Sequence, residues 1–394
     1  MSEPTHMDLE KRLTISKRFV IITIVLMAIG LIAFIYGLAT NTTKTWANLL
    51  MNNYYFLSLA IGATFFAALQ SITQSGWSAG IIRIPQAMGN VIPVIAVLMI
   101  PILLFGMHDL YHWTHEEAVK TDPLIAHKSP YLNIPFFVAR YAIFFAVWIL
   151  LTQYIRRLSL KEDRKGTLEY FRKIEFFNKV YIFALAVTFS LASFDYIMSI
   201  DVHWFSTIFA VRNFVMGFFH ASAVIMMIVI ILNKLGYLQF INKSHLRDMA
   251  KYVLVLSIIW TYTWFAQYIL IWYANIPEET IYYLPRTQGE FQVLFYSELI
   301  LNWVIPFLLL LSGMVVKSRA ALLAVGSILI IGHWVDMYQQ VIVGTYGHLE
   351  VGFIEVGTFL GFWGIFAYVV ARSLAAAPLV PLKHPYLEES LQHH

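Results

Sequence analysis

The residues best suited to chemistry are ionisable and amide side chains that interrupt long apolar stretches of the chain. His333 and Asp336 are three positions apart, so on a helix they share one face and lie within hydrogen-bonding reach. Imidazole titrates near neutral pH and a buried carboxylate can be tuned towards that range, so the pair predicts a group that passes a proton. A polar clamp between two helices is the alternative interpretation.

Further residues are candidates for a proton path or a quinone site, because an ionisable group inside a membrane is costly and therefore points to function. Glu298 and Asn302 are four positions apart on one helix face, and they can point into the same interior as His333. We assign no catalytic residue. The complete set of candidates is Asp195, His220, Glu298, Asn302, His333 and Asp336.

Two arginines also fall inside apolar stretches, where the low dielectric makes a neighbouring carboxylate necessary. Arg212 lies at a depth similar to that of Asp195, and Arg140 lies at a depth near both. We therefore expect a structural ion pair between Arg212 and Asp195, with Arg140 close to it.

The elements that position these residues are apolar runs of about 20 residues, the length of helix that crosses a bilayer. The chain has 394 residues, of which 59% are hydrophobic and 13% are charged, and its mean hydropathy is +0.68. We predict an all-α polytopic membrane protein, a single integral membrane domain over residues 1–394 with a cytoplasmic tail at 375–394. The ten predicted spans are 19–38, 54–72, 85–105, 134–155, 179–200, 206–232, 252–273, 291–315, 320–343 and 353–374.

The distribution of lysine and arginine predicts the orientation of these spans. With the N-terminus in the cytoplasm, 21 of the 27 basic residues lie on the cytoplasmic side, four lie outside and two lie within spans. Because cytoplasmic loops are enriched in basic residues, both termini are predicted to be cytoplasmic. The ionisable candidates then fall in the outer halves of their helices, with His220 and His333 near the middle.

The stretch FAQYILIWYANIPEETIYY, residues 265–283, ends an apolar span on the outer side. After Asn275, Pro277 suits the first position of a helix, and Glu278 and Glu279 suit the positive end of its dipole. One interpretation is an interfacial helix, and the other is a turn docked to a periplasmic subunit. The aromatic residues expected to anchor it at the membrane interface are Trp272, Tyr273, Tyr282 and Tyr283.

The residue types limit the redox cofactors that the chain can hold. It has no cysteine, which excludes thiolate iron–sulfur clusters and covalent c-type haem. Two b haems would need four histidines at mid-membrane depth, and only His220 and His333 qualify. A redox role must therefore use a diffusible quinone, such as menaquinone, or a partner that carries the metal centres.

Metal and nucleic-acid binding are less favoured by the pattern. His108, His112 and His115 lie together in one outer loop, and the spacing of the first two suits zinc on a helix, but no third ligand is tied to them. A solvated loop is the preferred interpretation, and no metal site is predicted. The basic residues sit at helix ends, which is typical of membrane topology rather than of phosphate binding.

Two long segments carry a resemblance to a known family. SLASFDYIMSIDVHWFSTIFAV, residues 190–211, together with residues 265–283, resembles the ActF-type membrane subunits of alternative complex III, a bacterial quinol:cytochrome c oxidoreductase. That family is similar to the polysulfide-reductase membrane subunits of the NrfD/PsrC type. The resemblance implies two four-helix bundles, spans two to five and six to nine (206–343), with spans one and ten peripheral.

The resemblance also implies partners and a location. The chain is expected in the bacterial inner membrane, beside an iron–sulfur, molybdopterin-like subunit, c-haem subunits and a second NrfD-like membrane subunit that is the better candidate for the quinol site. Electrons would pass on to a terminal oxidase. This chain would hold a secondary quinone site, conduct protons, or serve mainly as a structural scaffold; a stand-alone proton-coupled transporter is the competing hypothesis.

Overall fold

The computed structural model describes residues 9–393, which form helices and connecting turns and contain no strand. Ten helical segments in this range are long and apolar enough to cross a membrane, as predicted. These segments are α1 (Lys17–Thr40), α2 (Thr42–Ile72), Ala79–Leu110, α8 (Ile134–Lys165), Leu168–Ile200 with α9 (Leu168–Tyr196), α10 (Ile208–Lys234), α11 (Lys243–Ala274), Gly289–Leu310, α16 (Arg319–Thr345) and α17 (Phe353–Ala375).

Two of the spanning segments are built from several short helices. The third contains α3 (Arg83–Met88), α4 (Ile92–Pro101) and α5 (Met107–Leu110), and the eighth contains α14 (Gln292–Leu299) and α15 (Ile305–Leu310). Each includes a π-helical turn, at Ile102–Gly106 and Ile300–Val304. The second of these lies directly before Pro306, which has no N–H to donate to the preceding turn.

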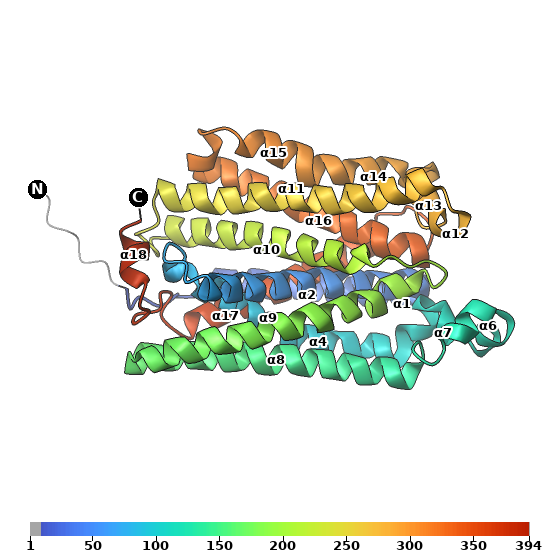
Figure 1. Ribbon diagram of the computed structural model, residues 1–394, viewed down its shortest axis with the longest axis horizontal. Coiled ribbons are helices and arrows are strands. Elements are labelled where there is room, and N and C mark those ends of the chain that lie inside the picture. The colour runs from blue at the N-terminus through green and yellow to red at the C-terminus, as the bar shows by residue number, and fades with distance from the viewer. Residues whose placement is uncertain (1–8, 394) are drawn as a thin grey trace, which may run out of the picture.

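The helices run along one long axis, so the molecule has two ends (Figure 1). One end carries α18 (Leu387–Leu391), the last turns of α8 and α10 and the first turn of α11, and we call it the terminal end. The opposite end carries α6 (Glu116–Thr121), α7 (Pro123–Lys128), α12 (Pro277–Thr280) and α13 (Leu284–Thr287), and we call it the turn end.

The centre of the molecule is formed by α2 and α10, which pack against each other and are the most buried spans. The α2 helix also contacts α9, α16 and α17, whereas α1 is largely exposed and packs mainly on α17. A methyl group on Gly30 of α1 would lie 2.5 Å from the Cα atom of Gly361, so this contact needs glycine. The division into two four-helix bundles stays a prediction. Helix α2, from the first predicted bundle, packs most extensively on α10, from the second predicted bundle, so the contacts do not separate the two bundles.

Several predicted span boundaries are wrong, in most cases because the helix is longer than its apolar part, although the eighth segment ends at Leu310 and not near residue 315. The second span begins at Thr42 and not near residue 54, since polar residues of its first turns are buried by other helices. The α8 helix continues to Lys165 and α9 already begins at Leu168. The turn between them uses Gly166 at φ +64°, a left-handed conformation that favours glycine.

Candidate functional site

A single buried guanidinium, that of Arg212, lies between two carboxylates. Its Nη2 atom is 2.7 Å from Oε1 of Glu298 and 2.9 Å from Oδ1 of Asp336. These side chains come from α10, α14 and α16, and each is at most 5% exposed. The predicted pairing of Arg212 with Asp195 is therefore wrong. Helix α10 packs against both α9 and α16, and depth along the helix does not determine towards which neighbour a side chain points.

Every oxygen of these two carboxylates accepts a hydrogen bond from the protein. Oε2 of Glu298 accepts from the Gln339 amide at 3.0 Å. Oδ1 of Asp336 accepts from the Gln340 amide at 2.7 Å, and Oδ2 accepts from the Trp260 indole at 3.2 Å. We refer to Arg212, Glu298 and Asp336 with these three donors as the arginine cluster.

The arginine cluster can store a proton because two opposing requirements act on it. One arginine and two ionised carboxylates leave a net charge of −1, and an uncompensated buried charge is costly. The surrounding donors favour ionised carboxylates, since each oxygen already accepts a bond. Protonation of one carboxylate therefore neutralises the cluster, but it competes with a hydrogen bond that this carboxylate already accepts.

His220 of α10 and His333 of α16 lie face to face. The rings of His220 and His333 are stacked with centroids 4.3 Å apart, and Tyr55 also stacks on His333 at 4.1 Å. Nε2 of His333 lies 3.2 Å from the Ser58 hydroxyl. The predicted hydrogen bond between His333 and Asp336 is wrong: within residues 9–393 the ring faces α2 and α10 instead.

Both ring nitrogens of His220 face oxygen atoms. Nδ1 lies 2.8 Å from the Met216 carbonyl, and Nε2 lies 2.9 Å from Oδ1 of Asn302. The Asn302 amide group donates to the Gly332 carbonyl at 3.1 Å, which turns its oxygen towards His220. A neutral imidazole has one N–H, so only the doubly protonated ring satisfies both contacts. Asn302 reaches this position from the π-helical turn of the eighth span.

Asp195 is not part of this group of residues. Its carboxylate accepts two bonds from Arg140 of α8, from Nε at 2.6 Å and from Nη2 at 3.1 Å. Arg140 also donates to the Tyr131 carbonyl and lies over the Tyr131 ring. This bidentate pair has the form of a structural clamp between α8 and α9. Of the six candidates, the structure therefore brings together His220, Glu298, Asn302, His333 and Asp336.

A polar row on α2 was missed by the hydropathy argument. Lys44 is buried against Glu355 of α17 at 3.2 Å, although the sequence suggests an outer loop for it. Asn48 donates to the same carboxylate at 3.0 Å, and Asn52 donates to the Thr358 hydroxyl at 3.1 Å. The spacing of Lys44, Asn48 and Asn52, four residues each, is the sequence signal that could have identified them.

The acidic turn has the predicted local structure but only part of the predicted aromatic belt. Asn275 ends α11 with φ +48°, and Pro277 begins α12 with Glu278 and Glu279 in its first turn. Glu278 is exposed. Trp272 and Tyr273 are exposed as expected, whereas Tyr282 and Tyr283 are buried, so their predicted interfacial role is wrong. The Tyr282 ring stacks on Trp204 at 3.9 Å.

The arginine cluster fits a proton better than a quinone. A quinone is held by hydrogen bonds to its ring oxygens, and the donors around Glu298 and Asp336 are already engaged by these carboxylates. No group of three or more His, Cys, Asp or Glu among the described residues is placed to hold a metal ion. In the outer loop, Nδ1 of His108 contacts the Thr114 hydroxyl and Nε2 of His115 contacts the His108 carbonyl.

Comparisons with known proteins do not identify a family for this chain. A scan against protein-family models gives no match, and a search of curated proteins returns no significant relative. The function is therefore argued from the geometry of the arginine cluster and the histidine pair.

Proposed function

We propose that this chain is a haem-free membrane subunit of a quinol-oxidising respiratory complex of the alternative complex III type, in which it holds and passes protons. The observation that carries the proposal is the arginine cluster, where two buried carboxylates share one guanidinium. The stacked pair of His220 and His333 adds a second group of ring nitrogens that can accept a proton.

The positive-inside rule supports an orientation for this proton route. The terminal end carries most of the lysines and arginines and is proposed to face the bacterial cytoplasm. The arginine cluster lies nearer the turn end, since Arg212 is in the second turn of α10 and α10 starts there. Protons from quinol oxidation would then be released towards the periplasm.

The turn end is also the proposed docking surface for periplasmic subunits. The acidic residues of α12 and the exposed rings of Trp272 and Tyr273 offer both charge and apolar area to a partner. The proposed partners are an iron–sulfur, molybdopterin-like subunit, c-haem subunits and a second membrane subunit of similar fold. They would supply the electron carriers, and a quinol bound in the complex would be oxidised to the quinone, with its two electrons passing to these carriers.

The assembly claim is tested by purifying the tagged chain from native membranes in a mild detergent. We expect haem-bearing subunits to co-purify, as shown by haem staining, while the chain expressed alone shows no haem absorbance. A chain that is stable and solitary in native membranes contradicts the proposal. Proton flux in vesicles that contain only this chain would favour the transporter hypothesis instead.

The proton claim is tested in the assembled complex with Asp336→Asn and Glu298→Gln. Each variant keeps the size of the side chain and removes the excess negative charge of the arginine cluster. We expect proton release per quinol oxidised to fall at least several-fold while the subunits still assemble. The matched control is Glu169→Gln, an exposed residue at the start of α9, outside both the cluster and the proposed docking surface. Unchanged proton release in both cluster variants would leave only a scaffold role.

A further inference from the structure

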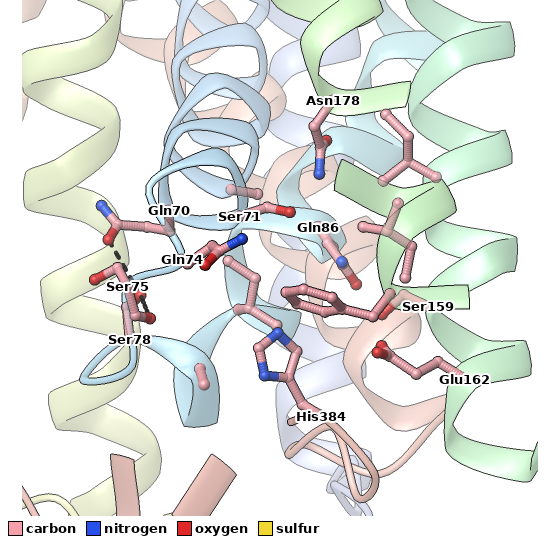
Figure 2. Close-up of a pocket in the computed structure, with 16 residues that line it drawn as sticks. Gln70, Ser71, Gln74, Ser75, Ser78, Gln86, Ser159, Glu162, Asn178 and His384 are labelled. Atoms are coloured by element: carbon pink, nitrogen blue, oxygen red, sulfur yellow. Dashed lines mark hydrogen bonds between the residues drawn. The ribbon is translucent and has the colours of Figure 1, made fainter. Parts of the chain in front are cut away.

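A polar cavity lies near the terminal end of the molecule, between the last turns of α2 and α8 and the C-terminal tail (Figure 2). It offers about 30 Å³ to the centres of water molecules, enough for a small number of waters. Its polar lining comes from α2, α3, α8, α9 and the C-terminal tail. The labelled residues are Gln70, Ser71, Gln74, Ser75, Ser78, Gln86, Ser159, Glu162, Asn178 and His384.

The carboxylate of Glu162 is the one ionisable acid that lines this cavity. The residue is 1% exposed, and neither carboxylate oxygen has a hydrogen-bond partner within residues 9–393. In Figure 2 its side chain points from α8 towards the cavity. A buried carboxylate without a partner is costly, so this group requires either water or a proton from the cavity.

The charged groups around Glu162 are engaged with other residues. Arg83 of α3 is paired with Asp163, the next residue on α8, and donates to the Ser159 carbonyl at 3.1 Å. Arg156, also on α8, donates to the Ser373 carbonyl at 2.7 Å. The segments of α2 and α9 that line the cavity contribute amides, hydroxyls and apolar side chains.

A second, separate cavity lies beside the first, closer to the middle of α2. This cavity of about 20 Å³ shares Gln86 and Asn178 with the first and reaches Thr64 and Tyr181, whose hydroxyls are 2.6 Å apart. Six residues further back along α2, about 9 Å by helix rise, Ser58 contacts His333. The polar lining therefore leads from the terminal end to within two helical turns of the histidine pair.

We propose that Glu162 is a proton-accepting site that takes a proton from a hydronium ion in this cavity, leaving a neutral carboxylic acid and a water molecule. The destination of that proton, the histidine pair, rests on the proposed function. The site at Glu162 does not depend on the proposed function. The source is bulk water at the terminal end, and the polar residues of both cavities hold the intervening waters.

The C-terminal tail forms one wall of the site. His384 lines the cavity, the Tyr386 hydroxyl donates to Gln74 at 3.0 Å, and the Leu382 N–H donates to Asp163 at 3.0 Å. Burial and the positive charge of Arg83 lower the pKa of His384 to about 4, so the ring is neutral near pH 7. A neutral wall does not repel an incoming proton.

The site is tested first by infrared difference spectroscopy of the purified complex across a pH titration. We expect a carboxylic-acid carbonyl band that appears on acidification and is absent in Glu162→Gln. The matched control is Glu169→Gln, because Glu169 is exposed and paired with Lys173 on α9. A band that is unchanged in Glu162→Gln, or no such band in the wild type, overturns the proposal.

Water access to the cavity is tested separately, because the natural chain has no cysteine. We expect Asn178→Cys to react with a small water-soluble thiol reagent, whereas Ala223→Cys, buried in α10, stays unlabelled. If both variants fold and neither one is labelled, the proposal is overturned. If Glu162 titrates but no haem-bearing partner co-purifies, the site stands and the proposed function fails. If partners and the Asp336 effect are found without the Glu162 band, only the site fails.

Discussion

The imidazole rings of His220 and His333 lie stacked in the middle of the molecule, with centroids 4.3 Å apart and planes inclined by 16°. Two positive charges at this separation repel by about 4 kcal/mol at an effective dielectric constant of about 20. The pair therefore holds at most one proton at a time. When the pair is protonated, the contacts of His220 with two oxygen acceptors favour His220 as the site of that proton.

Replacement of His220 by alanine is expected to remove this shared proton. Proton release by the assembled complex should fall about tenfold or more, equivalent to about 1.4 kcal/mol in the barrier. The measurement is the initial rate of proton release by the assembled complex during quinol oxidation. The matched control is His348→Ala, because the His348 side chain is 70% exposed at the turn end. Equal effects of both variants would contradict a specific role for the pair.

Replacement of Arg212 by alanine is expected to destabilise the protein strongly. It leaves two carboxylates buried without a cation, a change that costs about 3–5 kcal/mol for a broken buried pair. The midpoint of thermal unfolding in detergent should fall accordingly. Adding Asp336→Asn to Arg212→Ala should recover part of the loss, because one uncompensated charge is removed. A double variant no more stable than Arg212→Ala would contradict the electrostatic account.

Breaking the pair between Arg140 and Asp195 should affect stability without affecting proton release. Arg140→Ala leaves the Asp195 carboxylate buried without its two donors, and we expect a loss of about 3–5 kcal/mol. Complexes that still assemble should release protons at the rate of the wild type. Normal stability combined with impaired release would assign Asp195 to the proton route after all.

The stability of the protein should depend on pH through His384. Its pKa is lowered to about 4 by burial and by Arg83, whereas an exposed histidine has a pKa of about 6.5. The unfolded chain therefore binds the proton more readily, so this contribution is complete above about pH 6.5 and is lost as the pH falls towards about 4. Between neutral pH and about pH 5, the unfolding midpoint of His384→Gln should fall less than that of the wild type. Equal shifts would contradict the assignment.

Charge reversal on α12 tests the docking surface. Glu278→Lys changes an exposed residue, so the fold should be unaffected. We expect less haem-bearing partner to co-purify, measured as haem per chain. The control is Glu117→Lys on α6, another exposed acidic residue at the turn end. An equal yield of partner with Glu278→Lys would move the interface elsewhere.

The sequence alone determined the number of membrane-spanning segments, because a hydrophobic run long enough to cross a bilayer is visible within one chain segment. The position of a residue along its own helix was readable in the same way. His333 lies near the middle of α16, and Asp336 lies in its second half. The helical turn of Pro277 and Glu278 was also predictable, because it depends only on neighbouring residues.

Tertiary structure decided which polar groups meet. The sequence predicts similar depths for Arg212, Asp195 and Asp336, and only the direction in which the Arg212 side chain leaves α10 selects Asp336 on α16 rather than Asp195 on α9. The sequence prediction placed Lys44 in an outer loop, because hydropathy assigns a lysine to water unless a buried partner such as Glu355 is known. Hydropathy and depth describe one chain segment at a time, whereas an ion pair depends on the rotation and adjacency of two helices, and long-range packing determines both.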